Sequence, residues 1–142
     1  MSANLLCAID GTVHSARAAS LAVSLTKQLQ GDLTLLMVNP VLAGRGSPTY
    51  VWTDEQVERV LEQMGRRAQW LGLTNVRRES RRANKVADSI IAYADQNDID
   101  LIVIGMSDRS RLAKWLGGSV SREVTAKANC PTVIVRRIRD DL

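Results

Sequence analysis

Short, mainly apolar runs alternate with amphipathic stretches along the chain. The clearest apolar runs cover residues 5–9, 33–38, 101–104 and 132–135, and a weaker one covers 76–80. Short continuous apolar runs bounded by turn residues are typical of buried β-strands. The first run ends in Asp10-Gly11-Thr12, which has the composition of a turn. The pattern therefore predicts five strands.

The segments between these runs carry apolar residues three and four positions apart, the spacing of one helix face. Thr53 and Gln56 form a capping-box pattern at the start of the second such segment. Gly31 follows the first, where a glycine after a helix C-terminus is expected. The predicted helices cover residues 18–29, 54–71, 86–97 and 118–130.

Strict alternation of continuously apolar strands with helices indicates a parallel sheet covered by helices on both faces. We therefore expect one α/β domain over residues 1–142. In such sheets, ligands bind beyond the carboxyl ends of strands where the strand order reverses. The loops after the first and fourth strands, which follow Ile9 and Ile104, are the first candidates for a site.

The segment 39–51 interrupts this alternation. It holds Pro40, Gly44, Gly46 and Pro48 and has no apolar stripe to anchor it. We expect a mobile loop that becomes ordered only when a ligand or a neighbouring chain covers it.

Composition narrows the class of protein. The 142 residues are 45% hydrophobic and 24% charged, which is ordinary for a globular domain. Apolar runs fall far short of the ~20 residues that span a bilayer, and no secretory signal is legible, so we expect a cytoplasmic protein. Cys7, Cys130 and His14 show no metal-ligand spacing, so we expect reduced thiols and no structural metal.

The net charge of +4 raises the question of a nucleic-acid partner. The arginine pairs are short and lie at segment ends without interleaved aromatic residues, so solvated surfaces are the better interpretation. The pairs are Arg77-Arg78, Arg81-Arg82 and Arg136-Arg137.

Several catalytic motifs are excluded by the residue that each would require. A phosphatase motif D-x-D-G-T would need an aspartate at Ala8, and a G-x-S-x-G elbow beginning at Gly105 has Arg109 in place of its last glycine. Neither the P-loop nor the G-x-G-x-x-G fingerprint is present. We expect no vigorous enzyme, and at most slow ATP hydrolysis.

One motif survives these exclusions. Gly105-Met106-Ser107-Asp108, a nine-residue stretch, and then Gly118-Ser119-Val120 resemble the nucleotide motif G-x-x-G, nine residues, G-[ST] of the universal stress protein family. The resemblance extends over the whole chain, through 8–12 at the first strand, 100–105 at the fourth and 130–135 at the last.

This resemblance implies an open five-stranded parallel sheet of strand order 3-2-1-4-5, Rossmann-like and of the adenine nucleotide alpha hydrolase type. It also implies an adenine nucleotide, ATP or AMP, at the reversal between strands one and four, with Mg²⁺ if the ligand is ATP. Base and ribose would lie by Ala8, Ile9 and Asp10. Val38 would offer its backbone to the adenine edge, and Gly105 would lie under the ribose.

The phosphates would be held at the start of the last helix, by Gly118, Ser119 and Val120. Unpaired backbone N–H groups of a first helical turn attract anions independently of any resemblance. Plainer interpretations stand beside these roles. Ser119, taken alone, is better explained as a helix cap. Asp10 is explained equally well as a turn former, and Val38 can be explained as a residue of a buried strand.

The motif's second glycine is replaced by Asp108. A carboxylate ~4 Å from a phosphate charge costs on the order of 4 kcal/mol at an effective dielectric of about 20. Arg109, Arg111 and Lys114 follow closely and could offset it. The alternative is therefore a nucleotide-free dimeric stress or interaction protein.

The last strand predicts how the protein associates. A terminal strand leaves a row of unpaired N–H and C=O groups at the edge of the sheet. The resemblance also implies a homodimer through antiparallel contact of these strands about a two-fold axis. The expected interface residues are Thr132, Val133, Ile134, Val135 and Arg136.

Overall fold

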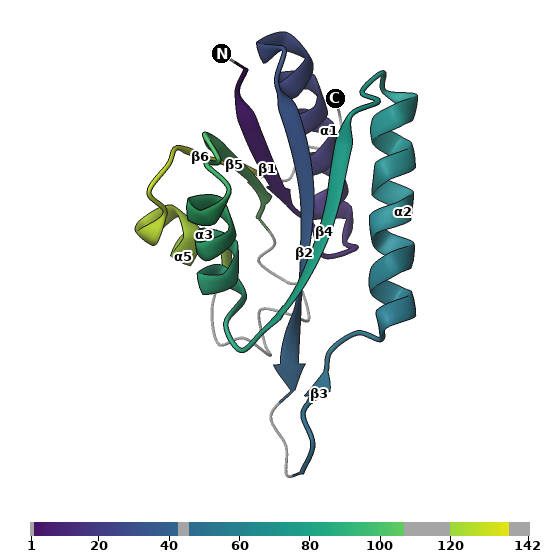
Figure 1. Ribbon diagram of the computed structural model, residues 1–142, viewed down its shortest axis with the longest axis vertical. Coiled ribbons are helices and arrows are strands. Elements are labelled where there is room, and N and C mark those ends of the chain that lie inside the picture. Colours follow the sequence, from purple (N-terminus) through teal and green to yellow (C-terminus); the bar gives the residue numbers. More distant parts are fainter. Residues whose placement is uncertain (1, 43–45, 107–119, 137–142) are drawn as a thin grey trace.

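The computed structural model describes residues 2–42, 46–106 and 120–136. A twisted sheet forms its centre, with helices on both sides (Figure 1). The strands are β1 Asn4–Ala8, β2 Asp32–Leu42, β3 Thr49–Tyr50, β4 Val76–Ala83, β5 Leu101–Gly105 and β6 Thr132–Val135. The helices are α1 Val13–Leu29, α2 Asp54–Trp70, α3 Val86–Gln96 and α5 Val120–Lys127.

The predicted parallel sheet is confirmed. β1 pairs with β2 on one side and β5 on the other, β2 pairs with β4, and β5 pairs with β6, all in parallel. The parallel strands thus lie in the order β4-β2-β1-β5-β6, which is 3-2-1-4-5 in their order along the chain. The sheet has one strand more than predicted, because the short β3 pairs antiparallel with the end of β2.

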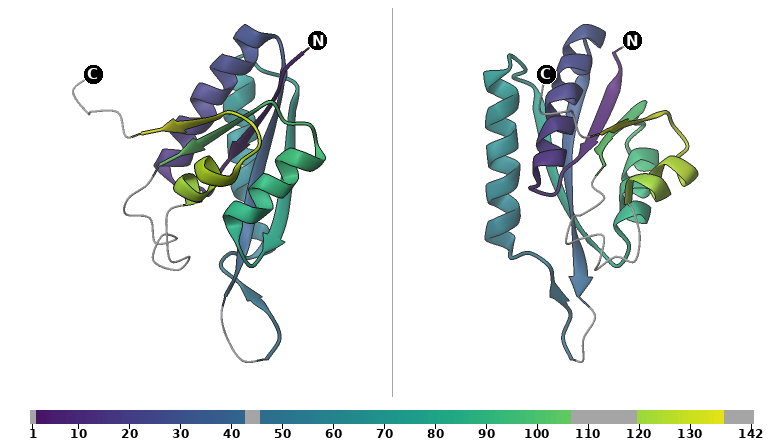
Figure 2. Two further views of the ribbon diagram at one scale, coloured as in Figure 1. Left: turned by 90° about the vertical axis from the view of Figure 1, so that its left-hand side faces the viewer. Right: turned by 180° about the vertical axis from the view of Figure 1, so that it is seen from behind.

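The helices lie on opposite faces of the sheet (Figure 2), and two apolar clusters hold these layers together. One joins α1 and α2 to the face of the sheet that carries Leu5, Cys7 and Leu35. The other joins α3 and α5 to the opposite face, which carries Leu6 and Leu36. Because β1 and β2 are buried on both faces, they are continuously apolar rather than alternating. None of the helices described is long and apolar enough to cross a membrane.

The expectation of a loop over residues 39–51 is wrong at both ends of that segment. β2 continues to Leu42, and β3 returns beside it, so that the two strands project beyond the rest of the sheet (Figure 1). Pro40 can lie within β2 because alternation turns its nitrogen away from β4, toward the side where β1 has already ended. Its carbonyl, on that same side, accepts a hydrogen bond from the Val51 N–H at 3.0 Å.

The first helix begins five residues before its predicted start and ends at Leu29 as predicted, although its C-terminal cap differs from the expected one. It begins at Val13 because Thr12 caps it, one turn before the first apolar residue of its stripe. At its other end, Gln30 and not Gly31 adopts the left-handed conformation, with φ of 51°. Gly31 is required for a different reason: a Cβ there would lie 2.2 Å from the carbonyl oxygen of Ala3.

Candidate functional site

The turn after β1 is organised by the side chain of Asp10. Its Oδ1 accepts hydrogen bonds from the backbone N–H of Thr12 at 2.9 Å and from the Thr12 hydroxyl at 2.6 Å. The Thr12 hydroxyl in turn accepts from the Ser15 N–H and caps α1. The interpretation of Asp10 as a turn former therefore accounts for the hydrogen bonds of its Oδ1. No hydrogen bond among the described residues uses Oδ2.

Gly105 ends β5 directly beside the first turn of α1. A Cβ at this position would lie 2.5 Å from the carbonyl oxygen of His14 and 2.7 Å from its carbonyl carbon. These are backbone atoms and cannot move aside as a flexible side chain can. Glycine at 105 is therefore explained by close contact between strand and helix, and this contact brings the end of β5 against the Asp10 turn.

The backbone ladder between β1 and β2 has an opening at Val38. The Leu36 carbonyl accepts the Ile9 N–H at 2.9 Å, and two residues beyond Val38 the Pro40 carbonyl accepts the Val51 N–H at 3.0 Å. Strand alternation turns the N–H and C=O of Val38 toward this same side. β1 has ended and β3 has not yet begun there, so the described chain supplies no partner for either group.

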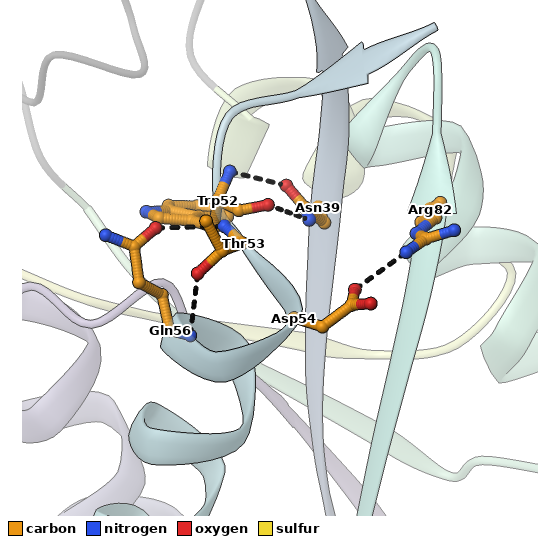
Figure 3. A network of polar contacts seen from close by, with 6 residues as sticks. All are labelled: Asn39, Trp52, Thr53, Asp54, Gln56 and Arg82. Atoms are coloured by element: carbon orange, nitrogen blue, oxygen red, sulfur yellow. Dashed lines mark hydrogen bonds and ion pairs between the residues drawn. The ribbon is translucent and has the colours of Figure 1, made fainter.

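A polar network fixes the projecting hairpin beside this opening (Figure 3). The buried Asn39 side chain accepts the Trp52 N–H at 3.0 Å and donates to the Trp52 carbonyl at 2.8 Å. The predicted capping box is present, with both of its hydrogen bonds. Arg82 of β4 donates to Asp54 at 2.7 Å and lies over the Tyr50 ring, 4.5 Å from its centroid. The hairpin is thus held to α2 and β4.

The residues around this site are weak candidates for a nucleophile or for metal ligands. Burial, and secondarily the negative charge of Asp10, raises the pKa of the Cys7 thiol to about 12, so it stays protonated at neutral pH. No cluster of three or more His, Cys, Asp or Glu side chains suited to a metal occurs in the part of the chain that the structure describes.

A comparison with known proteins decides the family. The family model described as the universal stress protein family matches residues 1–136. Universal stress protein YxiE from Bacillus subtilis is 32% identical, over 93% of this chain and 97% of the relative. The chain belongs to the universal stress protein family.

Solved structures of universal stress proteins share the fold. A structure described as a universal stress protein in complex with cAMP has a TM-score of 0.74 at 21% identity, covering 94% of this chain and 95% of its own. The universal stress protein from Archaeoglobus fulgidus in complex with dAMP has a TM-score of 0.68, also at 21% identity, covering 94% and 97%.

In this universal stress protein, the predicted site residues fall into three groups. The structure places Ala8, Ile9, Asp10 and Gly105 at or just after the carboxyl ends of β1 and β5, and Val38 in β2 just beyond the end of β1. Val120, the first residue of α5, packs against the α3 and α5 cluster. Asp108, Gly118 and Ser119 lie outside the described residues.

Sequence reasoning weighed His14 only as a metal ligand or a triad member. Its Nδ1 is buried and has no hydrogen-bond partner among the described residues. It lies in the first turn of α1, whose backbone touches Gly105. Nothing in the sequence pattern marks this position, because the contact joins residues 91 positions apart.

Proposed function

We propose that this universal stress protein binds an adenine nucleotide at the carboxyl ends of β1 and β5 and acts in stress response or signalling. The observation that carries the proposal is the opening at Val38. The N–H and C=O of Val38, which have no partner among the described residues, would match the donor and acceptor pattern along the edge of an adenine base. A parallel sheet offers such an edge where its strand order reverses, which here is at β1.

The remaining roles follow from position. Ala8 and Ile9 would line the base and ribose, the Oδ2 of Asp10 would accept a ribose hydroxyl, and Gly105 would lie beneath the sugar. The phosphates would meet Asp108, Gly118, Ser119 and the N–H of Val120, with Mg²⁺ accompanying ATP but not required for AMP. The two related structures described with cAMP and dAMP support this ligand class.

The proposal includes a homodimer formed through β6. Thr132, Val133, Ile134 and Val135 are all only half-buried, although their neighbours Ile102 and Val103 in β5 are fully buried, and Arg136 beyond them is exposed. Within the described residues, β6 pairs with β5 alone. Antiparallel pairing with a second copy would satisfy the outer edge and cover these apolar side chains.

We place this activity in the cytoplasm and describe it as binding rather than turnover. The thiols of Cys7 and Cys130 are both free, which is the state that a reducing compartment maintains. We propose neither a membrane nor a nucleic acid as a partner of this protein. Among the described arginines, Arg81 and Arg82 are engaged with side chains of the protein itself.

Two measurements test the proposal. Purified protein is denatured and the released small molecules are identified by mass spectrometry, with AMP or ATP expected. Calorimetry then compares AMP affinity for wild type, Asp10→Asn and the control Asp88→Asn in the exposed first turn of α3.

Asp10→Asn keeps an oxygen for the Thr12 turn but removes the charged acceptor. We therefore expect about tenfold weaker binding, the size of one charge-assisted hydrogen bond. Asp88→Asn should bind as wild type does. Release of no nucleotide, together with no calorimetric binding of AMP or ATP to wild type, would refute nucleotide binding and favour the alternative of a nucleotide-free protein.

A further inference from the structure

A polar groove lies at the opposite end of the sheet from the nucleotide site. α3 has 11 residues, whereas α1 and α2 have 17 each, so α3 ends before it reaches the amino ends of β2 and β4 (Figure 1). The uncovered end of this face forms a groove of about 540 Å³. That volume lies within the range of small-molecule sites.

Strand register brings four polar side chains to the floor of the groove. Asn4 of β1 pairs with Asp32 of β2, and Thr34, two residues along β2, pairs with Arg77 of β4. Paired residues in a parallel sheet share a face, as do residues two apart on one strand. All four therefore project from the α3 face, which becomes apolar one step further at Leu6 and Leu36.

The side chains of three of these residues have no hydrogen-bond or ion-pair partner in the part of the chain that the structure describes. Neither Asp32 nor Arg77 takes part in an ion pair among the described residues, although both line the same groove. Thr34 is only 8% exposed, and no hydrogen bond of the described chain uses its hydroxyl. The Cα atoms of Asp32 and Thr34 are ~7 Å apart along the strand, which separates the carboxylate from the cation opposite Thr34.

Two asparagines at the groove have fixed amide orientations. The Asn4 Nδ2 donates to the Asp98 carbonyl at 3.4 Å, and the Asn97 Nδ2 donates to the Tyr93 carbonyl at 2.9 Å. Each therefore leaves its Oδ1 to accept from another donor. The groove thus offers acceptors from Asp32 and the two asparagines, and donors from Arg77 and Thr34.

We propose that this groove binds a small zwitterion of the α-amino acid class. The ligand carboxylate bonds the Arg77 guanidinium and the Thr34 hydroxyl, which are the donors on the β4 side. The ligand ammonium bonds the Asp32 carboxylate and the oxygen of Asn4, on the β1 side. Opposite charges on neighbouring strands match a ligand that carries both charges a few ångströms apart. This site does not rest on the proposed nucleotide function.

Glycine is the probe ligand, and its binding is monitored through the amide chemical shifts of the ¹⁵N-labelled full chain. We expect residues 32–34 and 76–77 to shift in a saturable way, and acetate or methylammonium alone to bind at least tenfold more weakly than glycine. Arg77→Gln and Asp32→Asn should each weaken glycine binding about tenfold, since each removes one charge-assisted contact. Arg59→Gln, on the exposed side of α2, is the matched control and should bind as wild type does.

Three results would overturn the proposal. One is the absence of saturable shifts with glycine at tens of millimolar. Another is acetate binding as tightly as glycine, which would mark a simple anion site. The third is unchanged binding in both groove variants when their far-ultraviolet circular dichroism is native. The comparison of glycine with its two fragments uses wild-type protein, so it decides the question even if a variant fails to fold.

Discussion

Gly105→Ala is the substitution that most directly tests how the nucleotide site is built. The added Cβ would lie 2.5 Å from the carbonyl oxygen of His14, which is 0.9 Å short of an ordinary contact at 3.4 Å. The backbone conformation at Gly105 is not left-handed, so the whole effect comes from lack of space. Relief requires the first turn of α1 to move away from β5 by nearly 1 Å.

The cost of that movement can be estimated. Overpacking a well-packed interior by one methyl group costs typically 1–3 kcal/mol. The obstructing atoms belong to a capped helix, so we expect a loss of about 3 kcal/mol in the free energy of unfolding. For a chain of this size, that corresponds to a midpoint lower by about 10 °C. Nucleotide affinity should fall too, because the displaced turn carries Asp10.

Gly65→Ala provides the matched control. At Gly65 in α2, an added Cβ would lie 3.0 Å from the Cδ of Arg78, a flexible and exposed side chain. Alanine also gains about 1 kcal/mol over glycine within a helix, so Gly65→Ala should be neutral or stabilising. Both variants are compared by thermal and urea unfolding. If Gly105→Ala proves as stable as Gly65→Ala, close contact is not the reason for the glycine.

The remaining predictions concern four other positions. Asn39→Ala should cost about 1–3 kcal/mol and speed hydrogen exchange across 46–52, because both backbone groups of Trp52 lose their partner; exchange as slow as in wild type would contradict this. Burial raises the Cys7 pKa from 9.0 to about 12, so the native state holds this proton more tightly than the unfolded chain. Stability should therefore decline from pH 9 to 12, with a shallower slope in Cys7→Ala. Val133→Lys should yield a monomer by light scattering, and a wild type already monomeric at high concentration refutes the β6 dimer. Asp108→Gly should tighten binding increasingly from AMP through ADP to ATP in calorimetry, and an equal gain for all three would exclude charge as the cause.

Local signals in the sequence predicted much of the fold. The capping box at Thr53 joins residues three positions apart, so it is legible in the sequence and is confirmed by its two hydrogen bonds. The strands β1, β5 and β6 are mainly apolar, and their predicted bounds differ from the observed ones by at most one residue. The family resemblance supplied the strand order, which periodicity alone does not determine.

Contacts between distant residues account for what the sequence did not predict. Asn39 reads as a turn former, but it is buried because its amide satisfies Trp52, thirteen positions away. The sequence pattern predicts β4 only weakly, because Arg78 and Arg82 pack against α2 rather than entering an apolar core. The opening at Val38 depends on where β1 ends and β3 begins, and β3 itself was not predicted.

The proposed nucleotide site has two parts, whose binding energies would depend on different interactions. Base recognition would come from the backbone of β2, whose N–H and C=O are present whatever side chain stands at Val38. Phosphate recognition, by family resemblance, would come from the segment that holds Asp108, where side-chain charge decides the energy. Because the two parts lie on different strands and loops, their contributions should be nearly additive. A change at Asp108 should therefore alter the preference among AMP, ADP and ATP while leaving the preference for adenine unchanged.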